Sequence, residues 1–330
     1  MTASPAPLLS LRDLTVTFDT PAGPARAVRG LDLDVAAGEA IAVVGESGSG
    51  KSVTMLATLG LLPRALITGS ARLGDQELIG APIDVLRGVR GRRISMVFQD
   101  PMTSLNPVLT VGKHLSLVLD AHQSGLGKRE RRARAVELLE QVAIPQAARR
   151  VDAYPHELSG GMRQRVMIAM AIANSPEVLI ADEPTTALDV TVQAQIMELL
   201  TDLRRERGLA LVLITHDLGV VAGHTDRVAV MYAGRLVERA AVSDVFASPE
   251  HPYTRALLSC LPRLDERSDL GSIPGTPPNP VDLPPGCPFS LRCDLAVDAC
   301  RTDEPALVPF GRGEVACTVV TAGATAEVPS

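Results

Sequence analysis

Short runs of alternating or continuous apolar residues predict a series of β-strands along the chain. Residues 8–18 alternate apolar and polar side chains, a pattern typical of a strand with one buried face. Residues 41–44 and 178–181 are continuously apolar, as expected for strands that a parallel sheet buries on both faces. The other predicted strands are residues 25–28, 31–35, 92–98, 210–215, 227–232 and 235–240.

Helices are expected between several of these strands. Residues 51–59 and 190–207 each follow a buried strand, and residues 110–174 look mostly helical, with a break at Ile144 and Pro145. Strands that alternate with helices are the pattern of an α/β fold built on a parallel sheet.

The composition changes after about residue 248, where we place a domain boundary. Prolines crowd residues 271–288, which excludes a helix or a central strand there and predicts an extended connector. A cysteine-rich tail follows, and residues 321–330 are expected to be disordered. The predicted organisation is a large domain at residues 1–248, a helical subdomain within it at about 100–174, and a C-terminal extension at 249–330.

Charge and hydropathy limit the partners that the chain can have. The net charge of −6 gives no electrostatic basis for binding nucleic acid with the whole chain. The basic run at residues 128–134 is interpreted as a solvated helix face rather than a nucleic-acid patch. No apolar run is long enough to span a bilayer, and residues 1–7 lack the basic start and apolar stretch of a secretory signal. The chain is therefore expected in the cytoplasm, with any membrane contact made through a partner.

A glycine-rich loop lies between a predicted strand and a predicted helix. Residues 45–52 fit G-x-x-x-x-G-K-[ST] at each fixed position. The glycines allow backbone N–H groups to converge on a phosphate, and the N-terminus of the helix adds its positive end. Lys51 would contact the β- and γ-phosphates, and Ser52 would bind Mg²⁺. An incidental Gly/Ser turn is the alternative, and the strand and helix on either side of the loop argue against it.

Two acidic residues stand where the predicted strand at residues 178–181 ends. Asp182 would orient Mg²⁺ through water, and Glu183 would polarise the attacking water. Alone, the pair could equally cap the following helix. The phosphate-binding loop in the same chain favours the catalytic interpretation.

Two further polar residues follow predicted strands and are candidates for the same site. His216 comes directly after the strand at residues 210–215, where a sensor of the γ-phosphate would be needed. Gln99 follows the strand at residues 92–98 and could contact Mg²⁺ or the attacking water. Neither residue is specific by itself.

The cysteines all lie late in the chain, at Cys260, Cys287, Cys293, Cys300 and Cys317. In a reducing cytoplasm, this clustering favours metal ligation over disulfides. Four thiolates suit either an iron–sulfur cluster or tetrahedral zinc, although the spacing lacks the C-x₂-C knuckle typical of zinc ribbons. Thiols without a ligand are the third interpretation. Cys260 lies apart from the other four and is interpreted as a buried or idle thiol.

The run from Leu158 to Arg165 has the sequence LSGGMRQR and narrows these interpretations. It lies downstream of the glycine-rich loop and just before the acidic strand end, and it resembles the signature motif of the ABC ATPases. Nearly the whole chain resembles an ABC-transporter ATPase. The resemblance implies an α/β P-loop NTPase fold with a RecA-like core, an antiparallel β subdomain and a helical subdomain. It also implies that the chain hydrolyses ATP as half of a dimer.

The resemblance implies a role for each matched position. Phe18 resembles the aromatic residue that stacks on adenine, and residues 187–189 resemble the D-loop. The implied catalytic residues are Glu183, His216 and Gln99. The implied magnesium ligands are Ser52, Gln99 and Asp182. The implied nucleotide contacts are Phe18, Gly45, Glu46, Ser47, Gly48, Ser49, Gly50, Lys51, Ser52, Val53, Asp182, Ser159, Gly160, Gly161, Gln164 and Asp189, with the LSGG run capping the γ-phosphate of ATP held by a second copy.

Finer features resemble the dipeptide/oligopeptide (Dpp/Opp-type) importers within this family. Residues 99–107 resemble their Q-loop extension, and residues 251–254 (HPYT) and 273–317 are similar to their C-terminal extension. One departure is visible, because a His commonly lies four residues before the last Cys, where this chain has Gly313. In these importers the tail is associated with a [4Fe–4S] cluster, for which the implied ligands are Cys287, Cys293, Cys300 and Cys317.

The resemblance implies a motor subunit that couples ATP binding and hydrolysis to the uptake of di- and oligopeptides. The implied partners are a second, paralogous ABC ATPase, two transmembrane permeases and, indirectly, an extracytoplasmic substrate-binding protein, with no nucleic acid. The chain would then be a peripheral protein on the cytoplasmic face of the cell membrane. Import of nickel or another small solute is the alternative within the same subfamily. A soluble ABC ATPase acting on DNA or ribosomes is more remote, because residues 99–159 are too few for a coiled-coil arm and the chain has a single P-loop.

Overall fold

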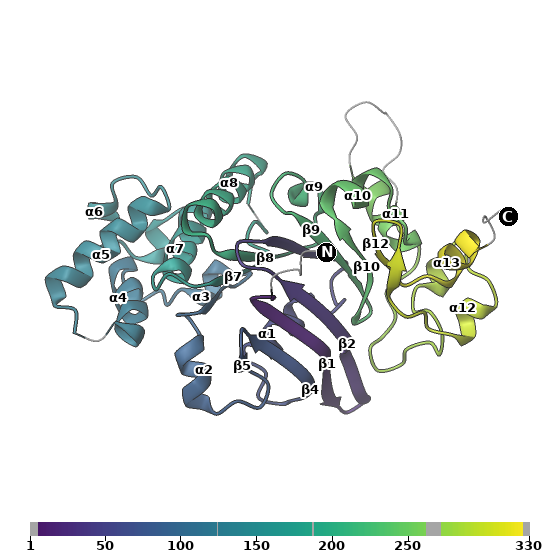
Figure 1. Ribbon diagram of the computed structural model, residues 1–330. Helices are drawn as coiled ribbons and strands as arrows, with labels where there is room; N and C mark the ends of the chain where they lie inside the picture. The colour runs from purple at the N-terminus through teal and green to yellow at the C-terminus, as the bar shows by residue number, and fades with distance from the viewer. Residues whose placement is uncertain (1–5, 124, 187, 262–271, 326–330) are drawn as a thin grey trace. The chain divides into compact units, whose positions relative to one another are not determined.

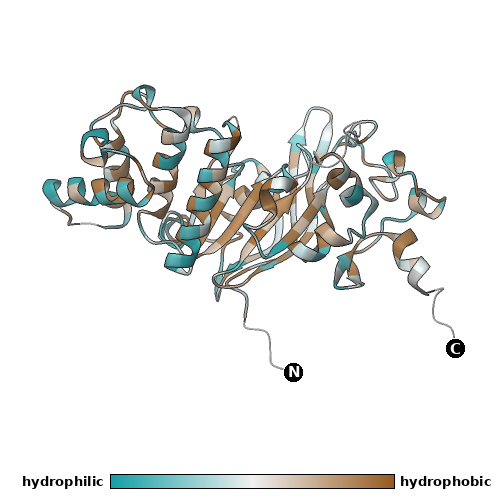
Figure 2. Ribbon diagram, turned by 90° about the horizontal axis from the view of Figure 1, so that it is seen from above, coloured by the Kyte–Doolittle hydropathy of each residue, from teal (hydrophilic) through white to brown (hydrophobic). Residues whose placement is uncertain are grey.

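The computed structural model of the chain describes residues 6–123, 125–186, 188–261 and 272–325 (Figure 1). Several strands are hydrophobic along most of their length, whereas many helices carry both hydrophobic and hydrophilic segments (Figure 2). This difference follows from burial, since a strand inside a sheet is covered on both faces and a surface helix on one.

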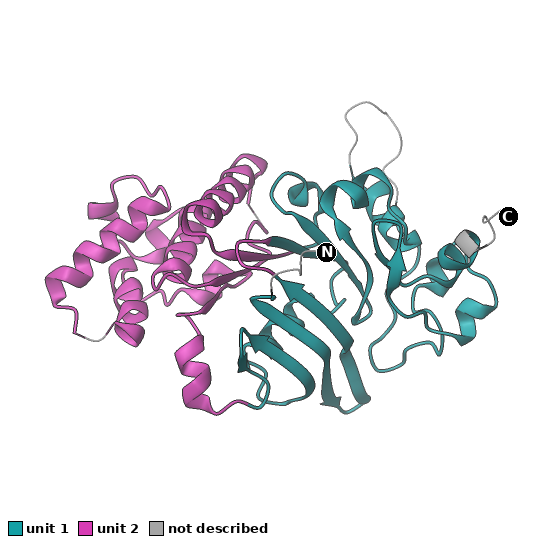
Figure 3. Cartoon of the chain, viewed as in Figure 1, with its two compact units in different colours: residues 1–35, 40–80, 215–330 teal, residues 36–39, 81–214 magenta. Residues whose placement is uncertain are grey.

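The chain forms two compact units (Figure 3). Unit 1 comprises residues 1–35, 40–80 and 215–330, and unit 2 comprises residues 36–39 and 81–214. The strands of unit 1 are β1 (Leu9–Thr20), β2 (Gly23–Val35), β3 (Ala40–Val44), β4 (Ala65–Leu73), β5 (Gln76–Glu77), β9 (Arg227–Tyr232), β10 (Arg235–Ala241), β11 (Val308–Phe310) and β12 (Gly313–Val315). Its helices are α1 (Lys51–Thr58), α9 (Leu218–Val221), α10 (Val242–Ala247), α11 (Pro252–Ser259), the 3₁₀ helix η2 (Ser290–Arg292), α12 (Ala299–Thr302) and α13 (Thr318–Thr325).

Unit 1 contains an antiparallel sheet in the order β2-β1-β4-β5. The alternating apolar residues of β1 are buried, as the sequence predicted. The two strands predicted at residues 25–28 and 31–35 are one strand, because Arg29 still pairs with Thr15 and Gly30 accommodates the local irregularity with φ +69°. The sequence pattern missed β4, in which only Ala71 and Leu73 are buried.

The other strands of unit 1 follow the order β11-β12-β10-β9-β3. β3 and β9 are parallel, and β9 and β10 form the hairpin predicted around residues 233–234. β12 pairs with β10, with Val315 opposite Glu238, so the C-terminal part of the chain extends this sheet.

The structure of the C-terminal part confirms the predicted extended connector and contradicts part of the predicted disorder. Among its described residues, 272–288 contain no helix or strand, as expected for a proline-rich connector. The prediction of disorder at residues 321–330 is wrong for residues 321–325, which belong to α13, while residues 326–330 lie outside the described chain. The first turn of α13 is anchored by Thr321, whose hydroxyl donates to the Cys317 carbonyl at 2.9 Å.

Unit 2 contains the parallel strands β6 (Ile94–Val97), β7 (Val178–Asp182) and β8 (Ala210–Thr215, its last residue counted with unit 1) in the order β8-β7-β6. β7 and β8 are fully buried, as their continuous apolar sequences predicted. The helices of unit 2 are α2 (Ile83–Val89), α3 (Pro101–Ser104), α4 (Val111–His122), α5 (Lys128–Gln141), α6 (Ala147–Arg150), the 3₁₀ helix η1 (Pro155–Glu157), α7 (Gly160–Ile172) and α8 (Val190–Arg207).

The helical part of unit 2 breaks where the sequence predicted, between α5 and α6. Ala143 and Gln146 take left-handed φ values of 54° and 55°, which a continuous helix cannot contain. The basic run lies on α5, where Arg132 forms an exposed ion pair with Asp152. Within the described chain, no helix combines the length and apolar composition needed to cross a membrane.

Candidate nucleotide-binding site

The glycine-rich loop of unit 1 joins β3 to the N-terminus of α1. Two of its glycines are required by geometry. A Cβ on Gly45 (φ +151°) would lie 2.1 Å from the Met231 carbonyl oxygen, and a Cβ on Gly50 (φ +103°) would lie 2.4 Å from that of Ala27. The loop is therefore packed directly against the backbone of β9 and β2, and no other residue type fits these two positions.

Lys51, the first residue of α1, lies under this loop. Its Nζ donates to the carbonyl oxygens of Gly45 at 2.7 Å and Glu46 at 2.9 Å. The Gly234 amide, in the β9–β10 turn, donates to the Ser49 carbonyl at 3.0 Å. A buried ammonium group at the positive end of a helix creates a site that favours an anion such as a phosphate.

The other predicted contacts in this unit lie near the loop in sequence or by strand register. Phe18 is half-buried on β1 and pairs with Ala25, two residues before the Ala27 carbonyl that packs against Gly50. His216 is exposed and directly follows β8. In the loop and the first turn of α1, Ser47 and Gly48 are exposed, and Ser52 and Val53 are half-buried.

In unit 2, the acidic pair stands at the end of β7. Asp182 is buried, and Glu183 takes a left-handed φ of 46°, which is strained for a residue with a Cβ. Glu183 Oε2 accepts hydrogen bonds from Gln99 Nε2 and Thr186 Oγ1, both at 2.9 Å. The structure thus brings together Gln99 and Glu183, two residues predicted for catalysis.

The LSGG run of unit 2 forms the N-terminus of α7. Ser159 caps this helix and accepts a hydrogen bond from the Met162 amide at 3.3 Å. A Cβ on Gly161 would lie 2.6 Å from Val192 Cγ1, so this glycine allows α7 to approach α8, while Gly160 has Leu188 as its neighbour. Gln164 is buried, and no partner within the described residues satisfies its Nε2.

The predicted D-loop lies just before α8. Asp189 caps α8, and its Oδ1 accepts a hydrogen bond from the Val192 amide at 2.9 Å. Residue 187, which belongs to the same predicted motif, lies outside the described residues. Asp189 and Ser159 are therefore both N-cap residues, and each side chain accepts a hydrogen bond from a backbone amide in the first turn of its helix.

Four cysteines of unit 1 line one pocket of about 20 Å³, room for about one water molecule. They are Cys287, Cys293, Cys300 and Cys317. Burial raises the pKa of the Cys287 thiol to about 11 and also raises the pKa of the Cys293 thiol. Cys260 lies apart, as expected, and its thiol contacts the Ala256 carbonyl oxygen at 3.2 Å.

The thiol pocket can be tested for its fit to a metal centre. Its donor set, four thiols around one small space, is of the type that iron–sulfur clusters and zinc use. In the described parts of the chain, however, no three His, Cys, Asp or Glu side chains are spaced to hold a metal ion. The four cysteines therefore match such a group by residue type, while their present positions do not form a metal site.

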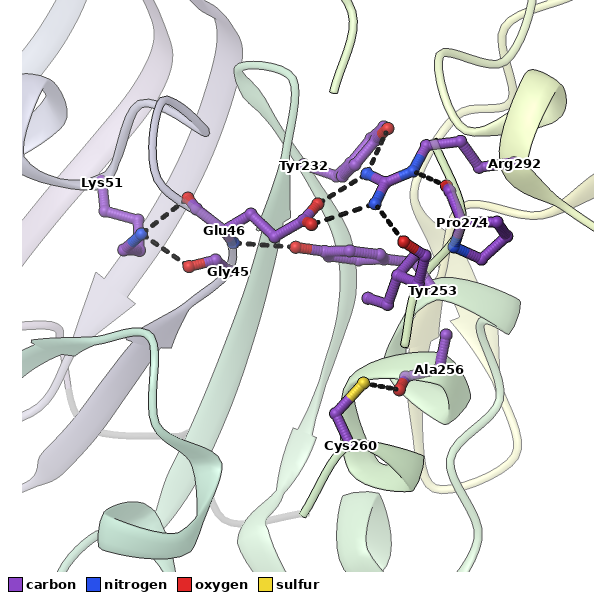
Figure 4. Close-up of polar contacts among 10 residues, drawn as sticks. Gly45, Glu46, Lys51, Tyr232, Tyr253, Ala256, Cys260, Pro274 and Arg292 are labelled. Carbon is purple, nitrogen blue, oxygen red and sulfur yellow. Dashed lines mark hydrogen bonds and ion pairs between the residues drawn. The ribbon is translucent and has the colours of Figure 1, made fainter. Parts of the chain in front are cut away.

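Sequence reasoning missed two residues that contact the glycine-rich loop. Arg292 binds the Glu46 carboxylate, and the Tyr253 hydroxyl accepts a hydrogen bond from the Glu46 amide (Figure 4). The only signal in the sequence was indirect. Tyr253 belongs to the HPYT run and Arg292 to residues 273–317, both of which carried the resemblance, but no role was assigned to either residue.

These features define a P-loop nucleotide-binding protein of the ABC type. A solved dimeric ATP-binding cassette in a post-hydrolysis state, bound to ADP and Pi, superposes with a TM-score of 0.64 at 33% identity, covering 71% of this chain and 98% of that one. Residues 28–186 match the family model of the ABC transporters, and residues 237–300 match that of the oligopeptide/dipeptide transporter C-terminal region.

Sequence relatives identify the particular family. The oligopeptide transport ATP-binding protein OppD of Salmonella typhimurium is 52% identical over 319 residues, or 95% of each chain. OppD of Escherichia coli is 52% identical over 300 residues, or 90% of this chain and 89% of that one. The chain spans about half of OppD of Mycobacterium tuberculosis, at 51% identity over 96% of this chain and 52% of that one. The chain belongs to the family of oligopeptide transport ATP-binding proteins within the ABC transporters, as its motifs predicted.

Proposed function

We propose that the chain is the ATP-hydrolysing subunit of an ABC importer that takes up di- and oligopeptides. The observation that carries the ATPase assignment is the complete glycine-rich loop, seated between β3 and α1 with Lys51 beneath it. Support for peptides as the cargo comes from the match of residues 237–300 to the C-terminal region of oligopeptide/dipeptide transporters. We assign the nucleotide-binding domain to residues 1–248, with a helical subdomain at about 100–174, and the C-terminal extension to residues 249–330.

Within this proposal, the P-loop amides and Lys51 bind the phosphates, and Phe18 stacks on the adenine. Ser52, Gln99 and Asp182 contribute to the binding of Mg²⁺, which neutralises the charge that develops on the phosphates. Glu183 polarises the attacking water. The hydrogen bond from Gln99 holds the carboxylate of Glu183 in one orientation until the nucleotide and its metal arrive. His216 senses the γ-phosphate.

A second ABC ATPase completes each site. Its signature helix would present an N-terminus to the γ-phosphate, where the helix dipole favours negative charge. In the same way, Ser159, Gly160, Gly161, Gln164 and Asp189 of this chain would contribute to the nucleotide site of the second ATPase. Two membrane permeases would transmit the closure of this dimer to the cargo, which an extracytoplasmic binding protein delivers. The chain would act as a peripheral protein on the cytoplasmic face of the membrane.

The four thiols of the extension are proposed to hold a [4Fe–4S] cluster. Such a cluster would cross-link segments of the extension that are distant in sequence. Anaerobic purification followed by iron, sulfide and zinc analysis tests this assignment. We expect about four irons per chain, lost in Cys293→Ser and retained in the control Cys260→Ser. Stoichiometric zinc, or no metal, would refute the cluster and leave the ATPase assignment intact.

The role of Glu183 is tested by Glu183→Gln, which keeps the size and shape of the side chain but removes the base. We expect ATP binding to persist while phosphate release slows by about 100-fold or more, the usual contribution of a general base. Glu198→Gln, on an exposed position of α8, is the matched control and should leave turnover unchanged. Near-normal turnover of Glu183→Gln would show that another group activates the water.

The cargo is tested in cells that lack this chain and therefore the activity of its importer. Restored uptake of a labelled tripeptide by the wild-type chain, but not by Glu183→Gln, supports peptide import. Uptake of nickel without uptake of peptide would show that the chain serves the alternative, a nickel importer.

A further inference from the structure

The C-terminal part of the chain contacts the P-loop through a two-point ion pair (Figure 4). The Arg292 guanidinium donates to both carboxylate oxygens of Glu46, at 2.7 and 3.0 Å. The Arg292 side chain is only 4% exposed and that of Glu46 is 28% exposed. A paired charge this deeply buried depends on its partner, because removing one member leaves the other desolvated and unpaired.

Aromatic residues surround this ion pair and orient it. The Tyr232 hydroxyl accepts a hydrogen bond from Arg292 at 3.2 Å, and the guanidinium lies 5.9 Å from the ring centroids of both Tyr232 and Phe289. Phe289 also packs against Tyr253, with ring centroids 5.3 Å apart. The guanidinium is therefore held by cation–π contacts as well as by charge.

Glu46, at the start of the P-loop, is held through its backbone as well as through the ion pair of its side chain. The Glu46 amide donates to the Tyr253 hydroxyl at 2.8 Å, while the Glu46 carbonyl accepts from Lys51 Nζ at 2.9 Å. Glu46 therefore links Arg292 directly to the lysine that serves the phosphates. A shift of Glu46 would move one of the oxygens that position the Lys51 ammonium group.

We propose that Arg292 is a positioning residue of the nucleotide site, and that the C-terminal extension sets the affinity of the chain for ATP through the Arg292–Glu46 ion pair. The Arg292 guanidinium binds the Glu46 carboxylate. It acts by holding Glu46, and Tyr253 supports it from the backbone side of the same residue.

The turn that carries Arg292 also connects this contact to the thiol pocket. The turn runs from Cys287 to Cys293, both of which line the pocket, and the Ser290 amide donates to the Cys287 carbonyl at 3.0 Å. A group bound by these two thiols would fix the turn at both ends. This link rests on the proposed role of the thiols, whereas the positioning role of Arg292 does not.

A double-mutant cycle on the full-length chain tests the positioning role. The variants are Arg292→Gln, Glu46→Gln and the double variant, and the measurement is the equilibrium affinity for a non-hydrolysable ATP analogue with Mg²⁺. We expect Arg292→Gln to weaken binding by about tenfold or more, because a buried charged pair is broken. The double variant should be no weaker than the weaker single variant, because both changes remove one interaction.

Controls separate positioning from a general loss of structure. Glu314→Gln breaks the Arg239–Glu314 ion pair, which ties β12 to β10 away from the P-loop, and should leave ATP affinity unchanged. Arg292→Lys keeps the charge but not the two-point geometry, so its affinity should lie between those of the wild type and Arg292→Gln. Unchanged affinity in a folded Arg292→Gln protein, or strictly additive losses in the double variant, would overturn the proposal.

The link to the thiols is tested by combining Cys287→Ser and Cys293→Ser with and without Arg292→Gln. Iron content and ATP affinity are measured on the same samples. The link is supported if the cysteine variants lose iron and bind ATP more weakly when Arg292 is present, but show no further loss of ATP affinity in the Arg292→Gln background. Loss of iron with unchanged affinity, or a wild-type chain without iron, removes the link. If the wild-type chain contains no iron, the cluster assignment is also refuted. The double-mutant cycle on Arg292 and Glu46 still tests the positioning role.

Discussion

The P-loop of unit 1 and the acidic strand end of unit 2 are held in place in different ways. The P-loop packs against backbone at Gly45 and Gly50 and is tied to the C-terminal extension by the buried Arg292–Glu46 pair. At the acidic strand end, the contact between Gln99 and Glu183 is a single exposed hydrogen bond. The Glu183 backbone adds strain, with φ at 46°.

This difference matches what each region has to do in an ATPase. A phosphate cradle works best when it is already formed, because nothing then has to be ordered when the nucleotide binds. In the proposed mechanism, Glu183 aligns with water only in the closed dimer, so it would benefit from contacts that are easily exchanged. Buried contacts therefore favour affinity at the P-loop, and exposed contacts favour movement at Gln99 and Glu183.

The largest expected effect is that of Gly45→Ala, because its Cβ would overlap the Met231 carbonyl oxygen. The P-loop would have to leave β9, and we expect a loss of about 3 kcal/mol or more in the free energy of unfolding, together with loss of ATP binding. Urea unfolding and binding of a fluorescent ATP analogue measure the two effects.

Gly48→Ala is the matched control for this change, within the same loop. Gly48 also takes a positive φ, of 80°, but a Cβ added there would have nothing within 4 Å of it. We expect only the backbone cost of about 1–2 kcal/mol. Equal losses at both glycines would mean that conformational strain, and not packing against β9, makes the loop rigid.

A smaller effect is expected in unit 2 from Gln99→Ala. Removing an exposed hydrogen bond should change the free energy of unfolding by no more than about 0.5 kcal/mol. Turnover should nevertheless fall by about tenfold, since Glu183 loses a group that orients it and Mg²⁺ would lose a proposed ligand. Thr186→Val, which removes a second donor to Glu183, tests whether orientation alone explains the loss. A clearly destabilised Gln99→Ala protein would contradict the contrast between the two regions.

The sequence predicted the P-loop in more detail than the acidic strand end. The P-loop was evident because its residues are contiguous and lie between a buried strand and a helix. Gln99 and Glu183 were predicted to be near one another only because both follow strands of a parallel sheet, and the structure places them 2.9 Å apart. The Arg292–Glu46 contact could not be predicted, because the partners are 246 positions apart and meet through the path of a proline-rich segment.

The fold shows the same limit. Strands with a complete apolar pattern, such as β3, β7 and β8, were predicted nearly to the residue. β4 was missed because only two of its residues are buried, and β12 because it is only three residues long. Burial creates the signal, so elements that are placed by tertiary pairing alone leave little trace in the sequence.

A smaller loss of stability than that at Gly45 is expected at Ser159, which has a local contact and a proposed contact with the nucleotide of a second ATPase. Because its side chain caps α7, Ser159→Ala should cost about 1 kcal/mol, whereas Ser159→Asp keeps a good cap and should be nearly neutral. The aspartate would nevertheless repel the γ-phosphate, so ATP-induced dimerisation in a Glu183→Gln background should be lost. Size-exclusion chromatography with and without ATP measures this loss, and thermal unfolding measures the cap. If Ser159→Asp still dimerises with ATP, Ser159 only caps α7 and does not contact the nucleotide of the second ATPase. The exposed residues of unit 2 would then include some with a purely structural role.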